Sequence, residues 1–442
     1  MGKDNIEKYS AGYAILKYFV DIWHNHIFYR KVIVLGRDNI NPNDHIIFAP
    51  NHQNALMDAM AVLCTLKKQP VFLTRADIFK TKLIASILYY LKMLPVFRLR
   101  DGFTNLKNND ETFNKTIEVL KNKNGLVILP EGNHLGFRRL RMLKKGICRI
   151  SFQAEEATDF TLDIKIIPVG IEFSNYTRFR QVLTVVYGKP IEVSAFYGMY
   201  KENPQRAIIE LKNRLSDQMK EIMVHIESED DYEAIDELRI LVNGKYSDDC
   251  KLPKLFRDRI LINKLNRLLK SDFLTYRNIC DLSLSIKKRA SKLNIDYRLL
   301  RKPNHSLGFL IAGTISLIAS SPIFLYGIIF NIIFIEIPKL LLKKISDEQF
   351  HSTVKYAVSL LLAFVFIPLY GVLSFVFVSP WWLALIVFIS IPLSGLFAWN
   401  YGLLYNRILG GFRIRKYISA HNTEYLLLKK EHTELVNMIS KL

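Results

Sequence analysis

The chain has 442 residues, of which 50% are hydrophobic and 12% aromatic, and its formal net charge is +20. So large a hydrophobic share is unusual for a wholly soluble protein and is typical of a chain with a membrane portion. A basic charge balance suits nucleic acid, an anionic membrane surface or phosphorylated substrates. The sequence contains long apolar stretches but no zinc-ligand spacing and no nucleic-acid-binding motif. We therefore expect membrane lipids and an anionic bilayer surface as partners, and no nucleic acid.

The cysteines are scattered and form no CxxC pair, at Cys64, Cys148, Cys250 and Cys280. Such a distribution is typical of reduced, mostly buried thiols. We expect the globular part of the chain to face a reducing compartment.

The first segment, residues 1–35, contains an apolar and aromatic run at residues 13–23 that is interrupted by Lys17 and Asp21. The run is too short and too charged to span a bilayer, and no small-residue cleavage site marks a signal peptide. We expect an amphipathic helix at the membrane interface, with an ordinary packing helix as the equal alternative.

Residues 36–200 alternate between short β-branched or aromatic runs and stretches of helical character. This alternation predicts an α/β domain, a mixed sheet flanked by helices. Strands are expected at residues 45–48, 69–73, 93–97, 126–129, 164–171 and 182–187, and helices at 112–120 and 146–154.

Residues 201–306 are expected to form a charged helical connector. Apolar residues recur at helical spacing through residues 204–226. Residues 251–302 are rich in Lys and Arg with leucines at intervals. Basic residues near an anionic bilayer contribute about 1 kcal/mol each, so this stretch suits a membrane surface.

Residues 307–406 are the expected membrane region of C-terminal α-helical segments. Residues 356–405 contain no Lys, Arg, Asp or Glu. They are long enough for two spans of about 20 residues each. Ser379 and Pro380, followed by two tryptophans, would turn this hairpin at the interface.

The basic flanks of both apolar stretches predict an orientation. If every flank lies in the cytoplasm, each stretch crosses an even number of times. Residues 307–337 would then be re-entrant and broken at Pro322, with one long tilted span as the alternative. The catalytic domain and the polar tail, residues 407–442, would lie on the cytoplasmic face.

A histidine and a carboxylate are the first candidate functional groups. His52 follows the predicted strand at residues 45–48, and Asp58 comes six positions later, at the start of a predicted helix. A histidine held by a carboxylate acts as a general base. By itself such a pair is more often a helix-capping or solvated pair.

Three further blocks follow His52 and Asp58 in the predicted α/β domain. Residues 94–102 form a strand that ends in Arg98 and Arg100, residues 129–134 read Leu-Pro-Glu-Gly-Asn-His, and residues 166–171 contain Pro168. A basic run at residues 138–145 follows the second of these blocks and suits anionic lipid or a solvated face. The arginine side chain binds phosphate through its planar fork, and Arg98 and Arg100 alternate so that both point to one face of a strand.

With these four blocks in order, residues 40–195 resemble the glycerolipid (1-acylglycerol-3-phosphate / glycerol-3-phosphate) acyltransferase family. The resemblance implies an O-acyltransferase of phospholipid biosynthesis that uses acyl-CoA or acyl-carrier protein as co-substrate, without cofactor or metal. His52 would be the base and Asp58 its orienting partner. Arg98 and Arg100 would bind a phosphorylated acceptor, and backbone N–H groups of Gly132 and Asn133 would stabilise the oxyanion.

The family also assigns Glu131 and Gly132 to the acceptor site and Pro168 to the acyl-donor site, with His134 in a supporting role. Five residues separate His52 from Asp58, whereas the commoner family form has four. The longer spacing occurs in a subset that includes glycerol-3-phosphate acyltransferases. We expect transfer to 1-acyl-sn-glycerol 3-phosphate, giving phosphatidic acid. The alternatives are glycerol 3-phosphate, a non-phosphate lysolipid or aminolipid acceptor, and a non-catalytic scaffold that binds anionic lipid.

Overall fold

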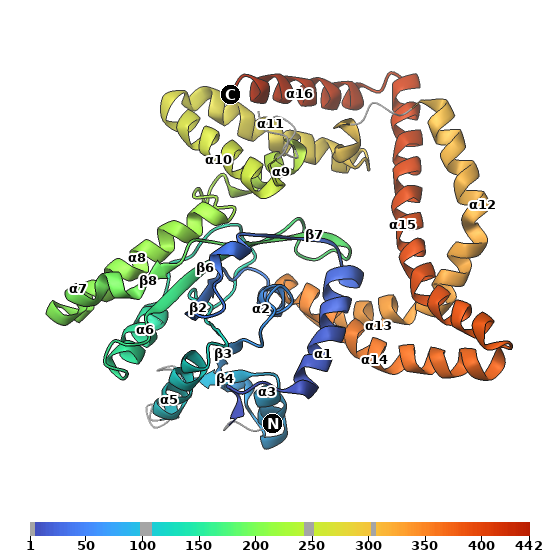
Figure 1. Cartoon of the computed structure of the whole chain (residues 1–442). Coiled ribbons are helices and arrows are strands. Elements are labelled where there is room, and N and C mark those ends of the chain that lie inside the picture. The colour runs from blue at the N-terminus through green and yellow to red at the C-terminus, as the bar shows by residue number, and fades with distance from the viewer. Residues whose placement is uncertain (1–4, 98–107, 243–251, 302–305) are drawn as a thin grey trace. The chain divides into compact units, whose positions relative to one another are not determined.

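The computed structural model describes residues 5–97, 108–242, 252–301 and 306–442 (Figure 1). The chain forms two compact units. Unit 1 comprises Met1–Val224 and Lys344–Ala357, and unit 2 comprises His225–Lys343 and Val358–Leu442. Each unit is considered by itself below.

Unit 1 begins with an amphipathic helix, α1 (Ala11–Ile22), which continues as a wider turn, η2 (Trp23–Phe28). Ser10 caps α1 by accepting a hydrogen bond from the N–H of Tyr13. Helix α1 buries Tyr13, Lys17 and Val20, while its other face exposes Tyr18 and other apolar side chains. The expected amphipathic helix is therefore present, and its contact with a membrane stays a prediction.

The described residues of unit 1 contain an eight-stranded sheet in the order β1-β7-β6-β2-β5-β3-β4, with β8 also paired to β6. Strands β6 and β7 pair antiparallel, as do β6 and β8, and the other pairings are parallel. The strands are β1 (Tyr29–Leu35), β2 (His45–Pro50), β3 (Val71–Arg75), β4 (Met93–Val96), β5 (Leu126–Val127), β6 (Ile164–Phe173), β7 (Gln181–Tyr187) and β8 (Ile191–Glu192).

Helices cover both faces of this sheet. Helices α5 (Asn108–Lys121), α6 (Gly146–Glu156) and α8 (Pro204–Ile222) enclose the main core with one face of the strands, including Ile47 and Ala49 of β2. Helix α2 (Leu56–Leu63) packs on β2 and β7, where the Phe48 and Tyr187 rings meet. Alternation along β2 thus sends successive side chains to opposite faces. The remaining elements of this unit are η3 (Arg37–Asn39), η4 (Ala76–Ile78), α3 (Lys82–Tyr90), η6 (Val193–Phe196) and α7 (Tyr197–Glu202).

Helix α8 belongs to unit 1, although the sequence places it in the connector. Its apolar stripe, including Leu211 and Leu215, is fully buried in the sheet's core. Gly170 of β6 lies so close to the carbonyl of Ile222 that a side chain would collide there. A glycine in the strand allows this close approach of helix and sheet.

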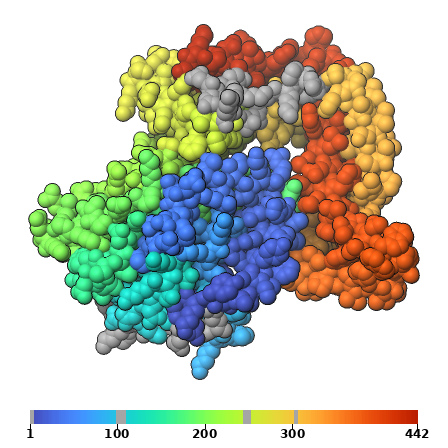
Figure 2. All heavy atoms as spheres, viewed as in Figure 1, coloured from blue at the N-terminus to red at the C-terminus, as the bar shows by residue number. Residues whose placement is uncertain are grey.

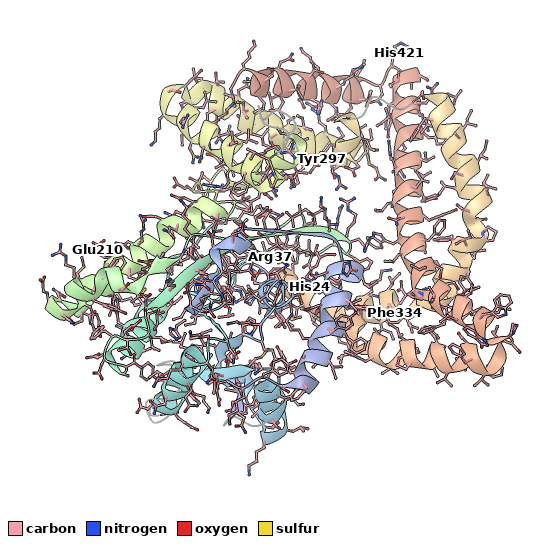
Figure 3. All side chains as sticks on the ribbon, in the orientation of Figure 1. His24, Arg37, Glu210, Tyr297, Phe334 and His421 are labelled. Atoms are coloured by element: carbon pink, nitrogen blue, oxygen red, sulfur yellow. The ribbon has the colours of Figure 1, made fainter. Side chains whose placement is uncertain are left out.

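Unit 2 is helical in its described residues. The connector forms α9 (Tyr232–Val242), α10 (Lys254–Ser271), α11 (Phe273–Lys292) and η7 (Tyr297–Arg301). The guanidinium of Arg239 donates to Asp258 at 2.9 Å, and both side chains are buried. The hydroxyl of Tyr297, which Figure 3 labels, donates to Glu237 at 2.6 Å.

In the part of the chain that the structure describes, three helical stretches are long and apolar enough to cross a membrane, at Leu307–Asn331, Glu348–Phe377 and Trp381–Ser419. They comprise α12 (Leu307–Asn331), η8 with α14 (His351–Phe377), and α15 (Trp381–Ser419), the latter two drawn in orange to red in Figure 2. Most of their apolar surface is exposed in the protein alone, as is expected of lipid-facing helices. A short helix, α13 (Ile333–Leu342), follows α12, and α16 (Thr423–Ser440) ends the chain.

The apolar helices differ from the sequence-based expectation at Pro322. The chain does not turn there, since α12 runs continuously from Leu307 to Asn331 with Pro322 inside it. The expected break at Pro322 is therefore absent, and whether this helix crosses the bilayer stays a prediction. At residues 356–405 the expected helical pair is present, because α14 ends at Phe377 and α15 begins at Trp381.

The expected fold class is confirmed: a mixed α/β sheet domain flanked by helices precedes a helical region with membrane-capable helices. Every expected strand is present with small shifts at its ends. Strand β1 was missed, because its residues fall in the segment expected to be an N-terminal helix.

Candidate active site

The candidate site lies where parallel strands of unit 1 end. Strand β2 leads into Asn51 and His52, β5 precedes Glu131, and β4 precedes the Arg98 block. The carboxyl ends of neighbouring parallel strands meet at one edge of a sheet, which is where open α/β sheets bind ligands. Among the described residues, this arrangement brings His52 and Glu131 together.

Asn51 fastens the end of β2 to β6. Its side-chain amide donates to the carbonyl of Ile171 at 3.1 Å, and its Oδ1 accepts from the N–H of Ile171 at 2.6 Å. Asn51 is fully buried, and its own N–H donates to the carbonyl of Val169. These bonds hold the residue before His52 in place, a role that is not evident from its position in the motif.

His52 and Asp58 form a hydrogen-bonded pair. Nδ1 of His52 lies 2.8 Å from Oδ2 of Asp58, which is in the first turn of α2 and fully buried. The same oxygen accepts from the backbone N–H groups of Gln53 at 2.8 Å and Asn54 at 2.7 Å. The carboxylate therefore orients the imidazole and also organises the loop that carries it.

The loop between His52 and Asp58 turns at Ala55, the residue before α2. Ala55 has φ 46° and ψ −126°, which is a costly conformation for a residue with a side chain. The turn closes the five-residue spacer so that Asp58 faces back toward His52. The longer spacing of the sequence is thus accommodated by one strained residue.

The pair fixes which nitrogen of His52 is basic. A carboxylate only accepts hydrogen bonds, so Nδ1 carries the proton of the neutral ring and Nε2 has the lone pair. The His52 side chain remains 17% exposed. Its Nε2 can therefore take a proton from a bound hydroxyl, while Asp58 stabilises the imidazolium that results.

Glu131 supports the backbone of His52. Its Oε1 accepts from the N–H of His52 at 2.7 Å, and its Oε2 accepts from the N–H of Arg141 at 3.2 Å. Burial raises the pKa of Glu131 to about 7, although both N–H groups act to lower it. The carboxyl group is 1% exposed, and in this structure it ties two loops together.

The turn after Glu131 departs from one expectation. Gly132 has φ 71°, a conformation that glycine adopts without strain. Its N–H donates to the carbonyl of Leu129 at 3.2 Å, so this donor is engaged within the turn and does not point at a bound oxyanion. The carbonyl of Asn133 accepts from the side chain of Arg141 at 3.4 Å.

His134 lies against the His52 ring. The two ring centroids are 5.3 Å apart at an interplanar angle of 68°. Burial lowers the pKa of His134, and the neighbouring His52 lowers it further. A neutral ring at this position packs beside the catalytic candidate without adding positive charge, and its supporting role stays a prediction.

The expected phosphate-binding residues are only partly described. Arg98 and Arg100 lie outside the described residues. Within the basic run at residues 138–145, Arg138 is buried and donates to the Glu172 carboxylate at 2.8 Å and to the carbonyl of Phe173. Arg138 therefore stabilises the end of β6 and does not belong to an exposed basic rim.

Pro168 lies within β6, opposite Ala49 of β2. A proline in a central strand lacks a ladder donor. Strand β6 pairs with β8 up to Ile166 and with β7 from Val169 onward. Pro168 thus occupies the gap between the two partners, where only its carbonyl is used, as the acceptor for the N–H of Gly188. This explains its place in the sheet, and its contact with an acyl donor stays a prediction.

The chain is similar to known proteins over this unit. Residues 31–172 match the model of the acyltransferase family. Glycerol-3-phosphate O-acyltransferase 2 of Saccharomyces cerevisiae is 29% identical over 130 residues, which cover 28% of this chain and 17% of the relative. Glycerol-3-phosphate O-acyltransferase 1 of the same yeast is 25% identical over 255 residues, covering 54% and 31%. The similarity thus spans less than a third of either relative.

A solved structure, the 1-acyl-sn-glycerophosphate acyltransferase PlsC from Thermotoga maritima, is 21% identical and covers 47% of this chain and 78% of that chain. The TM-score of that comparison is 0.34. The ordered blocks, the buried Asp58 against His52 and the family match agree with one another. Residues 31–172 of this chain form an acyltransferase-family domain.

Proposed function

We propose that this protein is a membrane-bound O-acyltransferase that transfers a fatty acyl group from a thioester donor to glycerol 3-phosphate. The observation that carries the proposal is the His52–Asp58 pair, with Nδ1 held by a buried carboxylate and Nε2 left as the base. Acyl transfer to a hydroxyl needs one such base and no enzyme nucleophile, because the acceptor hydroxyl attacks the thioester itself.

The reaction begins when Nε2 of His52 takes the proton of the acceptor hydroxyl. The oxygen attacks the thioester carbonyl carbon, and the carbonyl π electrons move to its oxygen. The tetrahedral intermediate then collapses and breaks the carbon–sulfur bond. The imidazolium returns its proton to the departing thiolate, so ester and free thiol are the products. Asp58 stabilises the imidazolium between the two proton transfers.

Two arguments bear on the acceptor. The yeast relatives are named as glycerol-3-phosphate acyltransferases, and the five-residue spacer between His52 and Asp58 is expected in a subset with such members. We therefore place glycerol 3-phosphate before 1-acyl-sn-glycerol 3-phosphate, whose acylation would give phosphatidic acid. Arg98 and Arg100 are the proposed phosphate ligands. The proposed donor is acyl-CoA or acyl-carrier protein.

The same proposal places the chain in a membrane. Among the described residues, three helices have the length and apolarity of membrane spans. The basic residues on both sides of the apolar pair at residues 356–405 favour two crossings there and a catalytic domain on the cytoplasmic face. A lipid product would then be released directly into the bilayer that the enzyme occupies.

The test is turnover by the full chain in lipid nanodiscs. Labelled acyl-CoA and acyl-carrier protein are offered with glycerol 3-phosphate, 1-acylglycerol 3-phosphate and a non-phosphate lysolipid, and products are identified by mass. We expect the His52→Ala variant to lose at least about 10³-fold in kcat while its melting temperature and nanodisc insertion are retained.

The exposed His421→Ala variant is the matched control and should turn over as the wild type does. Normal turnover by His52→Ala would refute the proposed base. Vesicle binding without turnover of any acceptor by the wild type would support the scaffold alternative instead.

A further inference from the structure

A segment from the far end of the chain packs beside the candidate active site. Lys344–Ala357, here called the linker segment, joins α13 to α14 and belongs to unit 1. It contains η8 (Glu348–Phe350), whose N-cap residue Asp347 accepts from the N–H of Gln349 at 2.9 Å. The 119 residues of His225–Lys343 separate the linker segment from the rest of unit 1 along the chain.

Two contacts fasten the end of the linker segment. Nζ of Lys355 donates to the carbonyl of Thr177 at 2.6 Å. Tyr356 is 2% exposed, and its ring lies 5.1 Å from that of Phe28 and 5.8 Å from that of His24. His24, which Figure 3 labels, is itself fully buried. An aromatic side chain buried to this degree stabilises the contact substantially.

The middle of the linker segment, at η8, reaches the site. The Phe350 ring meets the His134 ring edge-on, with centroids 4.9 Å apart and an interplanar angle of 87°. His134 in turn lies 5.3 Å from His52. Beside this contact, a Cβ on Gly136 would lie 3.2 Å from Cγ of Gln349. Phe350 is thus one ring away from the proposed base.

Phe350 keeps 38% of its surface exposed at this position. The hydrogen-bond partners of His52 in the site are the carboxyl groups of Asp58 and Glu131, which make polar surroundings suited to a polar acceptor. An open aromatic face one ring farther out is an apolar surface that suits a hydrocarbon chain. The chain also continues from Phe350 into α14, which is part of a span of mean hydropathy 2.5.

We propose that the linker segment forms part of the acyltransferase site and that Phe350 contacts the hydrocarbon chain of a fatty acyl thioester. Phe350 is then a specificity-determining residue that favours long acyl chains over short ones. The inference rests on the proposed function for the identity of the ligand, and it adds a wall of the site that lies outside residues 31–172.

Ligand binding without turnover tests the inference. The probes are S-hexadecyl-CoA and S-ethyl-CoA, thioethers that cannot transfer their alkyl group, measured against the full chain in nanodiscs. An ethyl group at the base does not extend past His134. We expect Phe350→Ala to lower the hexadecyl-to-ethyl affinity ratio about tenfold and Phe350→Leu to restore most of it. Phe273→Ala, an exposed phenylalanine of α11, is the matched control and should leave the ratio unchanged.

A disulfide tests the position of the linker segment. Gly136→Cys with Gln349→Cys should form a crosslink under mild oxidation, because a Cβ at position 136 approaches the Gln349 side chain closely enough. The crosslinked chain should keep its hexadecyl-CoA affinity, since the segment is already in its functional place.

The inference is overturned if the affinity ratio does not change in Phe350→Ala or if the wild type binds neither thioether. It is also overturned if the crosslink does not form, or if it abolishes hexadecyl-CoA binding. A wild type that shows the expected ratio but acylates no acceptor would refute the proposed function and leave the Phe350 inference standing.

Discussion

Replacing Asp58 by asparagine removes the negative charge beside His52 but preserves the size of the side chain. Oδ2 of Asp58 accepts three hydrogen bonds, from Nδ1 of His52 and from the N–H groups of Gln53 and Asn54. Oδ1 has no hydrogen-bond partner among the described residues. The asparagine can therefore keep its oxygen at the position of Oδ2 and turn its amide nitrogen toward the position of Oδ1.

This orientation retains the tautomer of His52, so the expected loss comes from the charge alone. In the transition state the imidazole becomes a cation 2.8 Å from the carboxylate. In a buried pair the charge-assisted hydrogen bond is stronger than its neutral equivalent. We therefore expect a loss of about 3 to 5 kcal/mol of transition-state stabilisation. That range corresponds to a decrease in kcat of roughly 10²- to 10⁴-fold.

The assay compares kcat and KM of Asp58→Asn and wild type in nanodiscs, with melting curves for both. Asp159→Asn, an exposed carboxylate outside the site, is the control. The KM for glycerol 3-phosphate should change little, because Asp58 acts through His52. A kcat within about threefold of wild type in a folded variant would refute the reasoning, as would a loss confined to KM.

Three further predictions concern buried groups. The folded-state pKa of Glu131, about 7, lies above its ordinary value of 4.5. The folded protein thus holds a proton that the unfolded chain releases, and the free energy of unfolding falls as pH rises from about 4.5 to about 7. Glu131→Gln should flatten that fall in denaturant titrations; an unchanged slope would contradict it. Asn51→Ala should cost about 2 to 4 kcal/mol of unfolding free energy, since it orphans both backbone groups of Ile171; a loss below about 1 kcal/mol would disprove this. Arg138→Met should cost about 3 to 5 kcal/mol by removing the guanidinium that is paired with the buried Glu172, whereas the exposed Arg206→Met should cost almost nothing.

Residue patterns over short distances were sufficient for six of the strands, several helices and the order of the motif blocks, but not for β1 and β8. The short apolar run at residues 45–48 and the turn residues after it identify a strand that ends just before His52. The spacing to Asp58 then predicts a pair, because both ends of that pair belong to one strand–loop–helix unit. The break expected at Pro322 was wrong, since a helix with apolar neighbours tolerates a proline within it.

The roles of several residues depend on contacts between distant parts of the chain, which local patterns do not encode. Arg138 resembles its basic neighbours in sequence but is buried against Glu172, because the end of β6 lies beside it in the fold. Glu131 binds the backbone of His52 only because parallel strands bring the two loops together.

His52, Asp58 and the ordered blocks were identifiable from the sequence alone because their spacing and residue types are local properties. The linker segment was not. Phe350 follows an unremarkable polar stretch, and only tertiary packing brings its ring to His134. The physical reason is that a site is assembled from residues whose separation along the chain carries no information about their distance in space, until long-range packing determines it.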